Sequence, residues 1–210
     1  MGEIFKGAIK FKEQDFQEHK ELFKQLGKFQ NPHTLFITCS DSRIDPNLIT
    51  KTKPGELFTI RNIANIVPYY DGTEIKYAGT TSAVEYAVKV LEVENIVVCG
   101  HSNCGGCAAL YKSEEELNQV PYVKKWLELA QKVKEEVLSI LEDPNDIEKR
   151  EWLTEQLNVV YQMDHLLSFP FIYEKYHAGK LNIYGWYYII ETGEIYNYNI
   201  ATETFELINS

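Results

Sequence analysis

The residue types that could carry chemistry lie in two well-separated segments, residues 39–43 (CSDSR) and 101–106 (HSNCGG). Cys39, His101 and Cys104 offer two thiolates and one imidazole, the ligand types that zinc prefers at a tetrahedral site. Three protein ligands leave the fourth position open to a water, which zinc makes acidic enough to attack an electrophile. The sequence therefore predicts an enzyme with a catalytic zinc ion.

Asp41 and Arg43 accompany the first ligand. A carboxylate next to a zinc-bound hydroxide can accept its proton in a hydrogen bond and so fix which lone pair faces the substrate. A neighbouring guanidinium would keep that carboxylate ionised and oriented. The alternative is an exposed ion pair at a strand end, worth about 0–1 kcal/mol. Their position beside a metal ligand favours the functional interpretation.

The charge of the ligand set predicts a pH dependence. Two thiolates cancel the formal charge of a zinc ion, whereas three neutral imidazoles leave it intact. The bound water should therefore be less acidic than in a three-histidine site, where it titrates at about pH 7. We expect activity to rise through alkaline pH.

Two other interpretations of the cysteines remain open from the sequence. Cys107 has metal-ligand spacing from Cys104 and could close a purely structural zinc site. The same two residues could instead form a redox pair at a helix N-terminus. Neither alternative gives a role to the pair formed by Asp41 and Arg43.

Composition limits the class of protein. A chain of 210 residues that is 44% hydrophobic and 25% charged suits one globular domain. A formal net charge of −10 argues against a nucleic-acid partner, because phosphate binding needs clustered Lys and Arg. No apolar run approaches the roughly 20 residues of a membrane span, and the first residues do not resemble a signal peptide. Four cysteines, two of them among ligand types, suggest reduced thiols, and we expect a cytoplasmic protein.

The elements that must position these residues follow a strand–helix–strand order. An amphipathic helix is expected over residues 3–26, followed by a strand over 34–39 that ends on Cys39. Asp45 and Pro46 are typical of a helix start, and Ser82 with Glu85 fits a capping box that opens another helix. The remaining expected strands are 57–60, 95–99, 182–190 and 194–200, and the remaining long helices are 121–140 and 146–165, separated by a break at 142–145.

This order predicts an α/β fold with a mainly parallel central sheet flanked by helices, an N-terminal helical arm and a C-terminal strand pair. Cys39 and His101 then fall at the carboxyl ends of strands, where open α/β sheets place their ligands. Cys104 precedes a helix whose first residues, Gly105 and Gly106, would present free N–H groups to an anion.

The chain resembles the β-class carbonic anhydrases in three motifs, C-x-D-x-R at 39–43, RNIAN at 61–65 and H-x-x-C-G-G at 101–106. Further matches at 76–79 (KYAG), 85–88 (EYAV) and 95–98 (NIVV) are most similar to the plant-type branch. The resemblance covers roughly residues 28–110. It implies a single zinc-dependent domain over 1–210, made of a dimerisation arm (1–27), a zinc-site core (28–110) and a third part of helices and C-terminal strands (111–210).

The resemblance also implies the reaction and the roles of the site residues. Zinc-bound hydroxide would convert carbon dioxide reversibly to bicarbonate and a proton, with one zinc ion per chain held by Cys39, His101 and Cys104. Asp41 and Arg43 would be the catalytic pair. A homodimer or larger homo-oligomer is implied, with no membrane partner. The implied substrate-binding residues are Gln30 from the neighbouring subunit, the apolar Phe58, Ile63 and Tyr86, and Gly105.

Two functions compete with this one. A hydrolase of carbonyl sulfide or carbon disulfide could use the same ligands, because those substrates are linear apolar relatives of carbon dioxide. A catalytically silent zinc protein belongs to a different class. An intact pair of Asp41 and Arg43 argues against it, since a silent protein has no chemical need for both.

Overall fold

The computed structural model describes residues 2–72, 77–143 and 145–209, and the chain divides into two compact units, Met1–Asn31 and Pro32–Ser210. Lys76, one of the residues that carry the resemblance, and Pro144 in the expected break lie outside the described residues. No helix in the described ranges is both long and apolar enough to cross a membrane.

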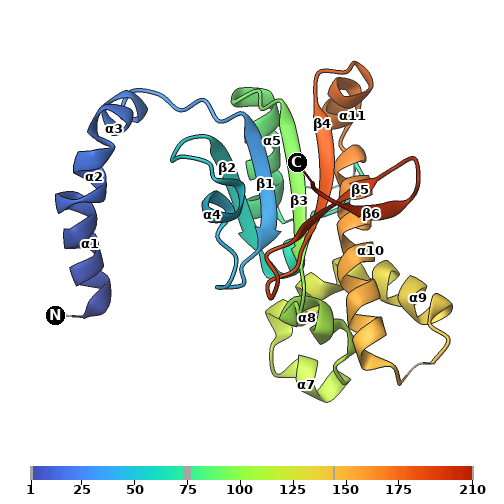
Figure 1. Ribbon diagram of the computed structural model, residues 1–210. Helices are drawn as coiled ribbons and strands as arrows, with labels where there is room; N and C mark the ends of the chain where they lie inside the picture. Colours follow the sequence, from blue (N-terminus) through green and yellow to red (C-terminus); the bar gives the residue numbers. More distant parts are fainter. Residues whose placement is uncertain (1, 73–76, 144, 210) are drawn as a thin grey trace. The chain divides into compact units, whose positions relative to one another are not determined.

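The N-terminal unit consists of three consecutive helices, α1 (Glu3–Glu13), α2 (Asp15–Glu18) and α3 (Lys20–Leu26) (Figure 1). The single helix expected over 3–26 is therefore interrupted, at Gln14 and at His19. The rings of Phe11 and Phe16 both pack on Phe23, with centroids 5.7 and 5.4 Å from it. Other apolar side chains of α1 are exposed, including Ile4 and Phe5. The amphipathic pattern is thus real, but much of its apolar face is uncovered.

The second unit is built on a six-stranded sheet in the order β2-β1-β3-β4-β5-β6. The first four of these positions run parallel, and β5 and β6 are antiparallel to their neighbours. The α/β fold with a mainly parallel sheet is confirmed, although the last strand was not expected. The strands are β1 (Thr34–Cys39), β2 (Leu57–Asn62), β3 (Asn95–His101), β4 (Asn182–Tyr188), β5 (Ile195–Asn199) and β6 (Thr204–Leu207).

The helices of this unit include one long element, α10 (Ile147–Leu167), close to the expected range 146–165. The expected helix over 121–140 is instead α8 and α9 joined by a tighter turn at Glu128–Ala130. The other helices are α4 (Pro46–Thr50), α5 (Ala78–Glu85), α6 (Gly105–Ala108), α7 (Glu114–Asn118), α8 (Pro121–Leu127), α9 (Gln131–Ile140) and α11 (Pro170–His177).

Of the two helix starts expected from the sequence, the one at Asp45 is confirmed and the one at Ser82 is not. Asp45 caps α4, since its side chain accepts hydrogen bonds from the backbone N–H groups of Asn47 and Leu48. The expected start at Ser82 is wrong, because α5 begins four residues earlier. Tyr77 adopts a left-handed conformation that turns the chain, and its carbonyl accepts from the N–H groups of the first turn. Ser82 therefore lies inside the helix rather than at its cap.

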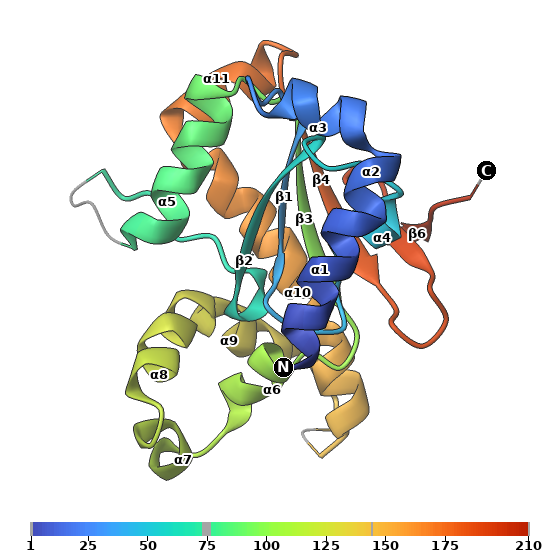
Figure 2. The same cartoon turned by 90° about the vertical axis from the view of Figure 1, so that its left-hand side faces the viewer.

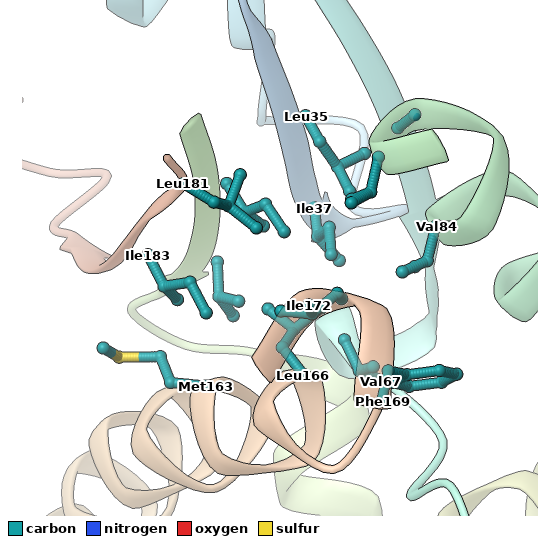
Figure 3. Close-up of a cluster of buried hydrophobic side chains, with 14 of the residues drawn as sticks. Leu35, Ile37, Val67, Val84, Met163, Leu166, Phe169, Ile172, Leu181 and Ile183 are labelled. Atoms are coloured by element: carbon teal, nitrogen blue, oxygen red, sulfur yellow. The ribbon is translucent and has the colours of Figure 1, made fainter. Parts of the chain in front are cut away.

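The main core lies between the sheet and the layer formed by α5, α10 and α11. Leu35 and Ile37 of β1 point to this side, toward Val84 of α5 and Ile172 of α11 (Figure 3). Phe36 points to the other face of the sheet and packs there with Val97 and Cys99. Burial on both faces explains why β1 is an unbroken apolar run.

The close approach of α10 to the sheet depends on a glycine. A Cβ atom at Gly100 would lie only 2.6 Å from Val159 Cγ2 and 3.4 Å from the backbone oxygen of Glu155. Only glycine allows backbones to approach this closely. The result is that α10 runs along β3 and β4, while α6, α8 and α9 group at the end where β1 and β3 finish (Figure 2).

Candidate metal centre

The three predicted ligands meet at the carboxyl edge of the sheet. β1 and β3 are adjacent and parallel, with Thr38 opposite Cys99, so their last residues, Cys39 and His101, end side by side. Cys104 follows within a short turn and precedes α6. The ligand atoms of Cys39, His101 and Cys104 all lie within 4.8 Å of one another, and the two sulfurs are 3.9 Å apart. The three residues are 4%, 1% and 2% exposed.

The histidine is prepared for a metal by its own hydrogen bonding. His101 Nδ1 lies 2.9 Å from the carbonyl of Ser102, which can only accept, so Nδ1 carries the proton. Nε2 then carries a lone pair, and it is buried without a hydrogen-bond partner. A buried nitrogen without a hydrogen-bond partner is rare in folded proteins, and a bound ion is one common explanation for it. The protonated Nδ1 and the unpartnered Nε2 of His101 therefore fit a metal ion bound at Nε2.

The two thiols also fit a cation. The adjacent Cys104 and burial together raise the pKa of Cys39 to about 12. Cys107 and burial raise the pKa of Cys104 as well. Two neighbouring buried thiols cannot both ionise unless a positive charge compensates them, and a divalent ion does so. Two sulfurs and one imidazole nitrogen favour zinc over the harder divalent ions.

Cys107 does not join this group. In the ranges that the structure describes, the cluster of potential ligands contains only Cys39, His101 and Cys104. All four cysteines are free, so Cys104 and Cys107 do not form a disulfide. The cluster therefore does not include the fourth ligand that a closed structural site would need, and Cys107 and Cys99 are buried.

Asp41 and Arg43 form a two-point ion pair beside the ligands. Arg43 donates from Nε to Asp41 Oδ1 at 2.9 Å and from Nη2 to Oδ2 at 2.7 Å. This pairing holds the pKa of the Asp41 carboxyl well below its usual range. Oδ2 also lies 4.0 Å from His101 Nε2. An oriented, ionised carboxylate is thus close to the unpartnered nitrogen, unlike an ordinary surface pair.

Two guanidinium groups tie the ligand segments together. Arg43 Nη2 also donates to the carbonyl of Asn103 at 2.9 Å, which joins the segment after β1 to the segment after β3. Arg61 donates to the carbonyls of Cys39 and Asp41 at 3.2 and 2.6 Å. The backbone on both sides of the cluster is therefore fixed by side chains.

The segment after β2 forms a wall next to α6. Ala64 and Asn65 both adopt the left-handed conformation, which is uncommon for residues other than glycine. A Cβ atom at Gly106 would lie 2.9 Å from both Ile63 Cγ2 and Ala64 Cβ. Glycine at position 106 therefore lets this wall close on the turn that carries Cys104.

Residues that the sequence interpretation did not single out hold this wall. Asn158 and Gln162 of α10 bind the carbonyl of Ala64 and the N–H of Val67, both at 2.8 Å. Trp126 of α8 donates to the carbonyl of Ile63 at 2.9 Å. The spacing of Asn158 and Gln162 places them on one helical face, but the sequence does not indicate that this polar face is buried.

The predicted substrate-binding residues are only partly brought together. Ile63 lies next to Gly106, where an added Cβ would be 2.9 Å from its Cγ2, and Gly105 is the first residue of α6. Phe58 and Tyr86 contact each other, with ring centroids 5.9 Å apart. Gln30 belongs to the N-terminal unit and is exposed.

Two cavities of about 870 and 540 Å³ lie elsewhere, and neither is lined by the metal ligands. The larger lies between α10 and the C-terminal strands. The smaller lies beside α5 and the segment at 68–71.

Comparison with known proteins finds carbonic anhydrases at the level of the family model, the sequence and the solved structure. Residues 34–195 match a family model described as carbonic anhydrase. A carbonic anhydrase of Helicobacter pylori is 45% identical over 98% of this chain and 94% of its own length. The solved structure of the β-carbonic anhydrase CcaA superposes with a TM-score of 0.90 at 38% identity, covering 98% of each chain. One of two tetrameric β-carbonic anhydrases from Sordaria macrospora has a TM-score of 0.77 at 30% identity, covering 92% of this chain and 94% of its own.

Proposed function

The chain belongs to the β-class carbonic anhydrases and catalyses the reversible hydration of carbon dioxide to bicarbonate and a proton, and we propose that Cys39, His101 and Cys104 hold the zinc ion for this reaction. The observation that carries the proposal is the buried His101 Nε2, which lies within 4.8 Å of two sulfurs and has no hydrogen-bond partner among the described residues. When bound, zinc supplies a water that is acidic enough to act as a nucleophile.

Asp41 and Arg43 would orient the reacting water. Asp41 presents an ionised carboxylate close to His101 Nε2, and its two oxygens are fixed by Arg43. Such a carboxylate accepts a hydrogen bond from the water and so determines which lone pair faces carbon dioxide. Because it only accepts, it also disfavours ligands that have no proton to donate.

The proposal extends to five residues that would bind the substrate. We assign the substrate-binding roles to Ile63 and Gly105 beside the ligands, to Phe58 and Tyr86 as apolar contacts, and to Gln30 as a donor from a neighbouring subunit. These residue types are those of the plant-type branch, so we propose that the chain uses a pocket of that type. The exposed ring of Tyr86 supports a pocket completed by a second chain.

Assembly and location are proposed on the same basis. The exposed apolar side chains of the N-terminal unit support a homodimerisation arm at residues 1–27, with 28–110 as the site core and 111–210 as the third part of a single domain. A neighbour from Sordaria macrospora is described as tetrameric, which supports a homo-oligomer. Four free cysteines are typical of a reducing compartment, which supports a cytoplasmic location.

The test is stopped-flow carbon dioxide hydration on protein of measured zinc content, from about pH 7 to 9, the range in which a zinc-bound water can titrate. We expect turnover that depends on zinc, disappears with a chelator and rises with pH. Full zinc content without hydration at any pH would overturn the assignment. The next assay would then be sulfide release from carbonyl sulfide and carbon disulfide.

A further inference from the structure

A buried glutamate lies against the backbone of one metal ligand. Glu155 of α10 is 4% exposed, and its Oε1 accepts the backbone N–H of Cys104 at 2.7 Å. The two residues are 51 positions apart in the chain, so the contact forms only when α10 packs on the sheet. A carboxylate is a strong acceptor for a backbone N–H group.

The second oxygen of the same carboxylate is also occupied. Tyr187 of β4 is buried, and its hydroxyl donates to Glu155 Oε2 at 2.7 Å. β4 is the strand next to β3, and Tyr187 lies opposite Gly100 in the register, one residue before His101. The carboxylate is therefore held between the sheet and the turn that carries Cys104.

Stability alone does not explain an acid at this position. Burying a carboxylate is costly unless it is paired, and an apolar side chain of similar size usually stabilises a core more. Within the described part of the chain, no lysine or arginine nitrogen lies within 4.0 Å of Glu155. Its partners at hydrogen-bond distance are the N–H of Cys104 and the hydroxyl of Tyr187.

The hydrogen bond from Cys104 to Glu155 is one of several that fix the turn at residues 102–104. Ser102 is bound at its N–H by the carbonyl of Tyr188 and at its hydroxyl by the N–H of Ile190. The carbonyl of Asn103 accepts from Arg43. Three successive residues of the turn are thus held by different parts of the fold: Ser102 by the end of β4 and the residues after it, Asn103 by Arg43, and Cys104 by Glu155.

We propose that Glu155 is a positioning residue that sets the backbone of Cys104, and hence the direction of its thiolate, before the metal binds, with Tyr187 orienting Glu155. The inference rests on the proposed zinc centre. Residues that orient metal ligands typically contribute roughly 10- to 100-fold to metal affinity or activity. Glu155 does not touch the ion or the substrate in this scheme.

The test compares four variants of the full chain by chelator competition for zinc. Glu155→Leu removes both acceptors, Glu155→Gln keeps an acceptor for Cys104, and Tyr187→Phe removes only the orienting hydroxyl. Thr154→Val is the matched control, because Thr154 is the adjacent buried residue of α10 and its hydroxyl bonds Tyr111 and the carbonyl of Arg150 rather than the backbone of Cys104. We expect Glu155→Leu to weaken zinc binding roughly 10- to 100-fold, Glu155→Gln to restore most of it and Thr154→Val to leave it unchanged.

Two further readouts separate positioning from general destabilisation. The backbone amide of Cys104 should exchange with solvent faster in Glu155→Leu and Tyr187→Phe than in Thr154→Val, measured by NMR on metal-free protein. The thiolate-to-cobalt absorption of the cobalt-substituted protein should shift in the same two variants.

Wild-type zinc affinity and an unchanged cobalt spectrum in Glu155→Leu and Tyr187→Phe would overturn the proposal. So would an equal loss of affinity in Thr154→Val, or no recovery in Glu155→Gln. If the wild-type protein itself binds no zinc or cobalt, the proposed metal centre fails instead, and the two failures are thereby distinguished.

Discussion

The guanidinium of Arg43 donates two hydrogen bonds to Asp41, from Nε and Nη2, and Nη2 also donates to the carbonyl of Asn103. One guanidinium therefore fixes the carboxylate that faces His101 and the backbone immediately before Cys104. The ion pair predicted from the sequence acts in the structure as a link between both ligand segments. Replacing Arg43 should therefore disturb the orientation of the Asp41 carboxylate and of the Asn103 backbone.

Asp41→Asn should keep zinc and lose most turnover. The amide preserves the shape of the side chain but no longer accepts at both oxygens, so the water is no longer oriented. We expect hydration to fall by roughly 10- to 100-fold or more at unchanged zinc content. Asp45→Asn is the control, because it removes the same charge nearby while an Asn still caps α4. Full activity in zinc-replete Asp41→Asn would exclude the orienting role.

Cys104→Ala should lose the metal, whereas Cys107→Ala should retain it. Cys104 contributes one of three donor atoms within 4.8 Å of each other, and Cys107 is outside that group. Zinc per chain, measured after dialysis, distinguishes the two variants. Retention of zinc by Cys104→Ala would show that the ligand set is wrong.

Gly106→Ala and Gly105→Ala should differ strongly despite being neighbours. The new Cβ atom at position 106 would lie 2.9 Å from Ile63 and Ala64, whereas at 105 it meets nothing within 4 Å. Overpacking of this kind costs about 1–3 kcal/mol of the free energy of unfolding. Urea unfolding of both variants measures the difference, and equal midpoints would contradict the packing argument.

His165 should make the metal-free protein less stable in mild acid. Burial lowers the pKa of His165, whose Nδ1 donates to the carbonyl of Val67 at 2.7 Å. The folded state thus resists protonation, while the unfolded ring accepts a proton near its ordinary pKa of about 6.5. Stability from the neutral ring is therefore present above that pH and is lost as the pH falls toward the folded pKa.

The measurement is urea unfolding of chelated wild type and His165→Gln between about pH 5 and 8, on either side of the ordinary histidine pKa. The stability difference between wild type and variant should shrink as the pH falls. A difference that does not vary with pH would show that His165 does not titrate in this range.

Local patterns and the site motifs were predictable from the sequence to different degrees. β1 has the expected bounds, and Asp45 followed by Pro46 marks the start of α4, because both depend on adjacent residues. The prediction that a helix begins at Ser82 was wrong because α5 begins earlier, after Tyr77 in a left-handed conformation. Side-chain types alone do not indicate that backbone conformation.

The clustering of Cys39, His101 and Cys104 was predictable because these residues end strands or directly follow them, whereas the residues that hold their backbone in place were not. Glu155, Asn158 and Gln162 act across separations of 51 to 95 residues. On the sequence alone they are polar residues of an acidic amphipathic helix. Only the packing of α10 on the sheet, which Gly100 permits, turns them toward the site.

The order of these residues along the chain has a consequence for biosynthesis. Ribosomes make proteins from the N-terminus, and Glu155 follows Cys104 by 51 residues. A nascent chain therefore exposes both thiols and the imidazole before the helix that anchors Cys104 has been made. If Glu155 positions Cys104 as proposed, metal captured during translation would be held by donors on an unanchored turn, and tight retention would begin only when α10 docks.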